Sequence, residues 1–123
     1  MTVNETYEMY LETILLLEGE VGNIRISDVA TKMNVSKASV NKAIKKLCEK
    51  DLIFHEHYGL ITFTDEGRKI ANATLAKHKL LNNFLCDILK VSKENAENDA
   101  CLMEHCISEE TFKCIELYYQ KHR

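Results

Sequence analysis

One short segment near the C-terminal end combines three residue types that bind transition metals. Cys101, Glu104 and His105 form the pattern C-x-x-E-H, and within a helix the positions i, i+3 and i+4 share one face. A thiolate, a carboxylate and an imidazole are all suitable donors for first-row divalent metals. A Glu–His pair beside a cysteine also arises by chance, and for this segment alone that interpretation is the commoner one.

Two other parts of the chain offer further donors. Met9 and Glu12 are three residues apart, so a thioether and a carboxylate face the same side of a helix. His78 lies in an apolar stretch, where a lone histidine is more often a core residue than a ligand. Taken together, these positions predict one metal site. Its candidate ligands are Met9, Glu12, His78, Cys101, Glu104 and His105.

The elements that must position these donors are mainly helices, because the chain has no proline and only four glycines. Apolar residues at three- and four-residue spacings predict a helix over residues 5–18 and a long one from Asp65, capped by Thr64, to about Leu89. Ser92 is expected to begin a helix that reaches Cys106, and Ser108 to begin the last one. The donors therefore lie on three separate helices.

A helix-turn-helix is predicted between the first helix and the long one. Ser27 is expected to cap a helix that ends at Lys32 or Met33, and Ser36 to cap a second helix over 37–48. The β-rich runs LIFHEH and LITFT follow, joined at Tyr58-Gly59, and predict a hairpin. A hairpin directly after a recognition helix is a wing, so the fold class is mainly α with an N-terminal winged helix-turn-helix.

Charge is segregated along the chain although the net charge is only −3. Residues 1–24 carry five acids and no Lys or Arg, whereas residues 25–50 carry seven bases against two acids. Such a basic block is typical of a DNA reader, although a lysine-rich face can also be merely solvated. The candidate DNA-binding residues are Arg25, Ser36, Lys37, Ala38, Ser39, Asn41, Lys42, Lys45 and Lys46.

Within this set the roles differ by residue type. The small polar residues at the start of the second helix suit close approach to base edges, and Lys42 can reach guanine or phosphate. Lys45 and Lys46, one turn later, fit phosphate contacts.

The remaining features concern location and the cysteines. No basic segment precedes an apolar run at the N-terminus, so no signal peptide is expected and the protein should be cytoplasmic. There, the five cysteines are expected to be thiols or ligands rather than disulfides. Apart from Cys101, they are interpreted as small core residues, namely Cys48, Cys86, Cys106 and Cys114.

Across nearly its whole length the sequence resembles the DtxR/MntR family of metal-dependent repressors. The stretches that carry the resemblance are TYEMYLETI, RISDVATKMNVSKASVNKAIKKLCEKDLI, LITFTDEGRKIA, KHKLLNNFL and DACLMEHCISEE. The resemblance implies a homodimer that binds a pseudo-palindromic operator when loaded with divalent metal. It implies a winged helix-turn-helix domain over 1–64 and a helical dimerisation and metal-binding domain over 65–123, without the SH3-like domain of longer members.

The ligand positions match the family unevenly. Met9, Cys101, Glu104 and His105 match the primary site of the iron-responsive branch, whereas Glu12 matches a manganese-branch ligand. His78 is a ligand position in both branches. The ancillary site of the iron branch adds a Glu and a second His, and this sequence departs from that pattern. Its candidate ancillary residues are Asn82 and Glu97.

Donor softness favours iron over manganese. The sulfur atoms of Met9 and Cys101 are poor partners for Mn(II) and better ones for Fe(II), Co(II), Ni(II) or Zn(II). Softness does not separate Fe(II) from Ni(II) or Zn(II), which bind more tightly, so availability in the cell must select among them. The function predicted is a transcriptional repressor that responds to Fe(II), with Mn(II) as the alternative metal.

Two other classes of protein are alternatives to a metal-dependent repressor. One is a winged-helix DNA-binding protein with no metal dependence, which the loss or persistence of DNA affinity on chelation would separate from a sensor. The other is an enzyme that uses Cys101 and His105. It lacks an orienting third group and any cofactor motif, so no enzymatic activity and no small organic substrate is expected.

Overall fold

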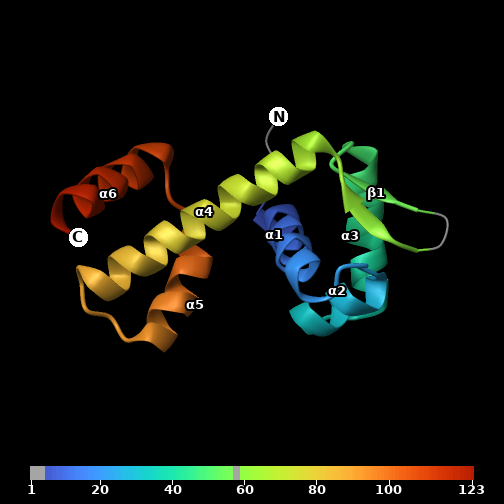
Figure 1. Ribbon diagram of the computed structural model, residues 1–123, viewed down its shortest axis with the longest axis horizontal. Coiled ribbons are helices and arrows are strands. Elements are labelled where there is room, and N and C mark those ends of the chain that lie inside the picture. Colours follow the sequence, from blue (N-terminus) through green and yellow to red (C-terminus); the bar gives the residue numbers. More distant parts are fainter. Residues whose placement is uncertain (1–4, 57–58) are drawn as a thin grey trace. The chain divides into compact units, whose positions relative to one another are not determined.

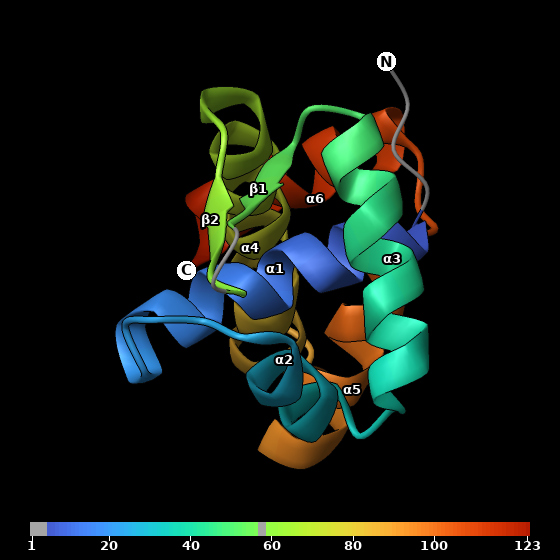
Figure 2. The same ribbon diagram turned by 90° about the vertical axis from the view of Figure 1, so that its right-hand side faces the viewer.

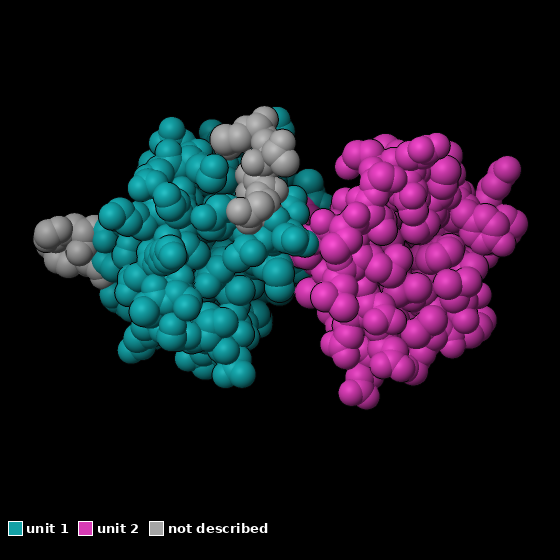
Figure 3. All heavy atoms as spheres, turned by 180° about the vertical axis from the view of Figure 1, so that it is seen from behind, with its two compact units in different colours: residues 1–73 teal, residues 74–123 magenta. Residues whose placement is uncertain are grey.

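The computed structural model describes residues 5–56 and 59–123 and divides the chain into two compact units, residues 1–73 and 74–123 (Figure 3). Each unit has its own hydrophobic core. The predicted division into domains at residues 64 and 65 stays a prediction. Among the described residues, no helix combines the length and the apolar character that a membrane span requires.

The first unit is built on helix α1 (Glu5–Glu20), which supplies one apolar stripe to its core. Tyr10, Leu11, Ile14 and Leu17 are buried at spacings of one, three and three residues, as the sequence pattern predicts. Helices α2 (Ile26–Met33) and α3 (Lys37–Glu49) pack against each other and against α1 (Figures 1 and 2).

The turn between α2 and α3 is tight because Asn34 adopts the left-handed conformation, with φ of 57°. Ser36 caps α3, since its hydroxyl oxygen accepts the N–H of Ser39 at 3.1 Å. These expectations are confirmed. The expectation that Ser27 caps α2 is wrong: Arg25 occupies the cap position, and its N–H donates to the Asp28 carboxylate at 2.8 Å.

Two short antiparallel strands follow α3 and form the wing (Figure 1). In β1 (Ile53–His55) and β2 (Ile61–Phe63) the paired residues are Ile53 with Phe63, Phe54 with Thr62 and His55 with Ile61. Ile61 also donates its N–H to the carbonyl of Ile24 at 2.8 Å, which ties the wing to the loop before α2. Of the predicted turn, Gly59 has φ of 85° and Tyr58 lies outside the described residues.

Helix α4 (Asp65–Asp87) begins directly on the wing. The Thr64 hydroxyl accepts the N–H of Gly67 at 3.0 Å and donates to the carbonyl of Asp51 at 2.8 Å, so Thr64 caps the helix as expected. Gly67 has no room for a side chain, since a Cβ there would overlap the carbonyl oxygen of Leu52. The mainly α architecture with a winged helix-turn-helix is thus confirmed.

The second unit contains the rest of α4 together with α5 (Lys93–Met103) and α6 (Glu109–His122). Its core is small and consists of Leu81, Leu85, Ala96 and Ala100, against which partly buried apolar residues pack. Ser92 and Ser108 cap α5 and α6 through the N–H groups of Asn95 and Thr111, as predicted. Both α4 and α5 end earlier than the sequence pattern indicated, at Asp87 and Met103.

Helix α6 lies against α4 through contacts between side chains. The Tyr119 hydroxyl donates to Asp87 at 2.8 Å, which raises the pKa of Tyr119, and the rings of Phe84 and Tyr118 meet edge to face. Lys77 lies over the ring of Phe112. Every residue of α6 is described and none is fully buried, so α6 leaves much of its surface accessible.

Candidate metal centre and nucleic-acid interface

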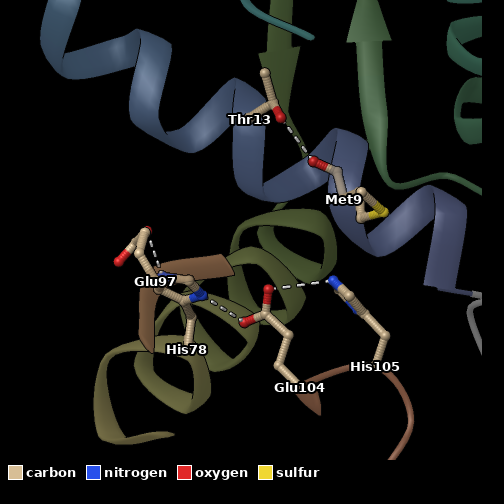
Figure 4. A network of polar contacts seen from close by, with 6 residues as sticks. All are labelled: Met9, Thr13, His78, Glu97, Glu104 and His105. Atoms are coloured by element: carbon tan, nitrogen blue, oxygen red, sulfur yellow. Dashed lines mark hydrogen bonds and ion pairs between the residues drawn. The ribbon is translucent and has the colours of Figure 1, made fainter. Parts of the chain in front are cut away.

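Glu104 is the C-cap residue of α5 and the most deeply buried acid among the described residues, at 3% exposure. Its two carboxylate oxygens face two imidazoles: Oε1 lies 3.2 Å from His105 Nε2, and Oε2 lies 3.5 Å from His78 Nδ1 (Figure 4). Removing an ionised carboxylate from water costs several kcal/mol unless charge partners compensate, roughly in proportion to its burial. The position of Glu104 therefore indicates a site that receives positive charge.

His78 lies on α4 between two carboxylates. Its Nε2 is 2.8 Å from Glu97 Oε1, and its Nδ1 faces Glu104 (Figure 4). When Nε2–H of a neutral ring donates to Glu97, Nδ1 carries a lone pair that points toward another electron-rich group. A metal-binding histidine commonly has this arrangement, with one nitrogen donating to a carboxylate and the other available to a cation.

The donor chemistry of this cluster fits a divalent metal. One buried carboxylate and two imidazole rings are typical ligands of first-row metals, and the cluster Glu97–His78–Glu104–His105 contains two acids. A dication placed among these atoms would offset both negative charges. The structure thus brings together four residues that the sequence analysis selected.

Asn82 lies one turn after His78 on α4, so both are on the same helix face. Its side-chain oxygen Oδ1 is buried and has no hydrogen-bond partner among the described residues. Only the family resemblance indicated Glu97 as a candidate site residue. Its contact with His78 spans 19 positions of the chain, and no local spacing signals such a contact.

Cys101 is half-buried on α5, one turn before Glu104. The expectation that Cys101, Glu104 and His105 share one helix is wrong in one respect, because α5 ends at Met103. Glu104 still has helical dihedral angles and donates its N–H to Ala100, whereas His105 lies in the turn that follows. The turn carries the His105 ring to the side where Glu104 lies.

Met9 and Glu12 lie one turn apart on α1, in the first unit. The Met9 side chain is 39% exposed and Glu12 is half-buried. The carbonyl of Met9 accepts a 2.8 Å hydrogen bond from the Thr13 hydroxyl (Figure 4), so this part of α1 is regular helix. Both side chains are presented at the surface of the first unit rather than in its core.

The candidate DNA-reading residues on α3 all lie on its solvent-exposed face. Val40, Ala43, Ile44 and Leu47 form the buried stripe of this helix. The exposed positions are Ser36, Lys37, Ala38, Ser39, Asn41, Lys42, Lys45 and Lys46. A capped helix with a small polar N-terminal end and exposed lysines has the shape and charge that major-groove recognition requires.

Some of these side chains are already engaged within the protein. The hydroxyls of Ser36 and Ser39 are 3.0 Å apart, and Lys46 pairs with Glu49 at 3.7 Å. Arg25 is exposed and lies before α2 rather than on α3, with its Nη1 close to the wing residue Gly59. Arg25 therefore lies where the helix-turn-helix meets the wing.

The other cysteines differ in their surroundings. Cys48 and Cys86 pack against the cores of the first and second units. Burial raises the pKa of the Cys48 thiol, and a hydrogen bond with the His55 backbone partly offsets this rise. Cys106 and Cys114 are exposed, so the expectation that they are core residues is wrong. Cys106 lies in the turn after α5 and Cys114 lies on α6, and the small core of the second unit covers neither.

Two family models of known proteins match this chain, and together they cover nearly all of it. The family model described as "iron dependent repressor, N-terminal DNA binding domain" matches residues 2–61. A second model, "iron dependent repressor, metal binding and dimerisation domain", matches residues 64–123.

Individual relatives agree with these matches. The transcriptional regulator MntR of Escherichia coli O6:H1 is 39% identical over 118 residues, which is 96% of this chain and 76% of the relative. An uncharacterized HTH-type transcriptional regulator of Methanocaldococcus jannaschii is 30% identical over 97% of this chain and 96% of its own length. The solved structure of the manganese regulator SloR has a TM-score of 0.81 at 28% identity over 98% of this chain. The chain spans about half, 55%, of that protein.

Proposed function

The chain belongs to the iron-dependent repressor family, and on that premise we propose that it is a transcriptional repressor which binds operator DNA as a homodimer when it holds a divalent metal. The observation that carries this proposal is the buried Glu104 carboxylate between His78 and His105. Burial of an ionised carboxylate costs free energy, and a divalent cation bound beside it would offset that cost.

We assign the metal to six ligands from both units. The proposed set is Met9, Glu12, His78, Cys101, Glu104 and His105. When bound, the metal supplies a positive charge that donors from α1, α4 and the end of α5 share. Met9 and Glu12 are thereby proposed to couple the bound metal to the winged helix-turn-helix.

We assign Glu97 the role of holding the His78 ring, with Nε2–H toward Glu97 and Nδ1 toward the metal. Asn82 and Glu97 together are also the candidate residues of an ancillary site. Asn82 Oδ1 is a buried acceptor, and Asn82 lies on the same face of α4 as His78, which Glu97 contacts. The two roles of Glu97 predict different stoichiometries, one metal per subunit or two.

Iron is the proposed metal. The contacts of the second unit involve oxygen and nitrogen atoms, which suit Fe(II) and Mn(II) alike, so the sulfur atoms of Met9 and Cys101 decide in favour of Fe(II). Mn(II) is the alternative, because SloR, which the chain resembles, is a manganese regulator.

Operator recognition is assigned to α3. Lys45 and Lys46 are proposed to contact phosphates. The exposed residues at the start of the helix are proposed to meet base edges, namely Ser36, Lys37, Ala38, Ser39, Asn41 and Lys42. Arg25 is proposed to contact DNA from the junction with the wing. Two such helices in a dimer would read half-sites one helical turn apart, near ~34 Å.

Dimerisation is proposed to use the apolar surface of the second unit, which the family match describes as a dimerisation domain. Leu102, Leu117 and Tyr118 are all large and exposed there. Exposed leucines of this kind gain about 1.5–3 kcal/mol each when they become fully buried.

The deciding experiment is an anaerobic titration of the purified protein with Fe(II) and with Mn(II), followed by elemental analysis and a mass measurement in solution. DNA affinity is measured in parallel on a duplex selected from a random library, with each metal and with a chelator. We expect a dimer whose DNA affinity falls at least about fivefold on chelation, the lower end of common coupling between sites. Equal affinity with and without metal would remove the sensing function. Binding with micromolar Mn(II) but not with Fe(II) would reverse the choice of metal.

A further inference from the structure

Arg68 connects three elements of the first unit through one side chain. Its Nη1 donates a hydrogen bond to Oε1 of Glu18 on α1, and its Nη2 donates one to Oε2 of the same residue, both at 2.8 Å. The guanidinium group also lies over the ring of Phe63, with 5.0 Å between Cζ and the ring centroid. Phe63 belongs to strand β2 of the wing, so helix α1, helix α4 and the wing meet at Arg68.

The backbone that carries Arg68 is held firmly. Gly67 packs directly on the Leu52 carbonyl, and Thr64 bonds both Gly67 and Asp51. Arg68 itself donates its N–H to the carbonyl of Thr64 at 3.0 Å. The main chain of Arg68 is therefore fixed relative to the wing, and its guanidinium group is held by the contacts with Phe63 and Glu18.

We infer that Arg68 is a positioning residue which fixes the orientation of α1 for metal binding and passes that orientation to the wing. This inference rests on the proposed function, because it concerns how the ligands Met9 and Glu12 are presented. Glu18 follows Glu12 by six residues on the same helix, so a constraint at Glu18 limits how Met9 and Glu12 rotate and translate.

The chemistry of the contact favours positioning over stability. A bidentate arginine–carboxylate pair fixes both distance and plane, which a lysine cannot do. Hydrogen bonding with Glu18 raises the pKa of Arg68 above its already high ordinary value, so the guanidinium group stays charged at any physiological pH. Because Arg68 is about half exposed, the pair contributes little to the free energy of unfolding.

The chain offers a matched control two residues further along α1. Glu20 forms an ion pair at the same 2.8 Å distance, but its partner Lys32 belongs to α2 rather than to α4 or the wing. Replacing Glu20 removes the same charge from the same helix as replacing Glu18.

The test measures three quantities for wild type, Glu18→Ala, Arg68→Met and Glu20→Ala. The first is the ratio of DNA affinity with Mn(II) to that with a chelator. The second is Mn(II) affinity without DNA, from competition with a fluorescent chelator, and the third is the melting temperature. For Glu18→Ala and Arg68→Met we expect the ratio to fall at least about fivefold, within the common range of coupling between sites. Mn(II) affinity should fall in both, with melting temperatures close to that of wild type. Glu20→Ala should resemble wild type in all three measurements.

Two more variants separate positioning from loss of charge. Arg68→Lys keeps the charge but loses the bidentate contact, and it should give an intermediate ratio. The exchange of Glu18→Arg with Arg68→Glu restores an ion pair, and its ratio should exceed that of either single variant. A wild-type ratio in Arg68→Met, or an equal loss in Glu20→Ala, would overturn the inference alone. A ratio near one in wild type itself, with Fe(II) as well as with Mn(II), would overturn the proposed function and this inference with it.

Discussion

At the scale of single residues, the candidate centre depends on how Glu104 is buried. An acid at 3% exposure that faces two imidazoles is costly to maintain, and such arrangements concentrate at functional sites. The neighbouring His78 is bonded by Glu97 on one side and faces Glu104 on the other. Each of these groups therefore has a defined geometric role that substitution can test.

Replacing Cys101 with alanine should abolish metal-dependent DNA binding. The thiolate is a proposed ligand, and its loss should lower metal affinity by more than the ~10–100-fold that an outer-shell partner typically accounts for. Metal affinity by chelator competition, DNA affinity with and without metal, and circular dichroism would be measured. Cys86→Ala is the control, since Cys86 is another half-buried cysteine of the second unit. Metal-activated DNA binding at wild-type level in Cys101→Ala would exclude this ligand.

Replacing Glu97 with alanine tests the orientation of His78. Without the 2.8 Å contact the ring can turn or change tautomer, so metal affinity should fall by about 10–100-fold while the fold is retained. Asp99→Ala, at an exposed acid on the same helix, is the control for the change in charge. Equal metal affinities in the two variants would mean that Glu97 does not hold His78. Loss of one of two bound metals would support the ancillary role instead.

At the scale of elements, the start of α4 packs directly against the connection between α3 and the wing. Thr64 caps the helix and simultaneously bonds the end of the α3–β1 connection at Asp51. Gly67 allows the helix to approach the Leu52 carbonyl directly. This junction explains why the sequence has a glycine at a helix position where alanine has the better propensity.

Gly67→Ala should destabilise the protein. The new Cβ overlaps a backbone atom, which cannot move as a flexible side chain could, so we expect a loss of about 1–3 kcal/mol in the free energy of unfolding. Gly19→Ala is the matched control, because a Cβ there meets nothing within 4 Å and should be neutral or stabilise by up to ~1 kcal/mol. Urea denaturation of both variants measures the difference. If Gly67→Ala were as stable as wild type, the close approach of α4 to Leu52 would be incorrect.

At the scale of the whole molecule, the second unit has too small a core to cover its apolar side chains. Leu102 and Leu117 are 68% and 64% exposed, and the buried cluster has only four members. Association of two copies through this surface would cover them, which agrees with the family match to a dimerisation domain.

Leu117→Glu should therefore weaken the dimer. It removes an apolar contact and places an unpaired carboxylate in the interface, so we expect the dissociation constant to rise at least about 100-fold. Analytical ultracentrifugation over a range of concentrations measures the change. Asn72→Glu, which adds the same charge at an exposed position of α4, should leave the dimer unchanged. A dimer of wild-type strength in Leu117→Glu would remove this part of α6 from the interface.

Much of the fold was predictable because its signals are local. The apolar stripes of α1 and α3, the caps at Ser36, Thr64, Ser92 and Ser108, and the left-handed Asn34 all depend on residues within one or two turns of each other. The early end of α5 at Met103 was not predicted, because the sequence pattern through Cys106 is still compatible with a helix. The cap of α2 was mispredicted because the helix begins at Ile26, one residue before Ser27, where the Asp28 carboxylate accepts the N–H of Arg25.

Sequence alone therefore determined the types of donor, the basic recognition helix and the order of the elements. Only the tertiary structure decided that Glu104 is buried, that His78 reaches both Glu97 and Glu104, and that Arg68 captures Glu18 across 50 positions of the chain. The physical reason is that helical periodicity indicates which face a residue occupies but not which distant element covers that face. Burial and charge pairing are properties of the packed elements, and they appear only when those elements meet.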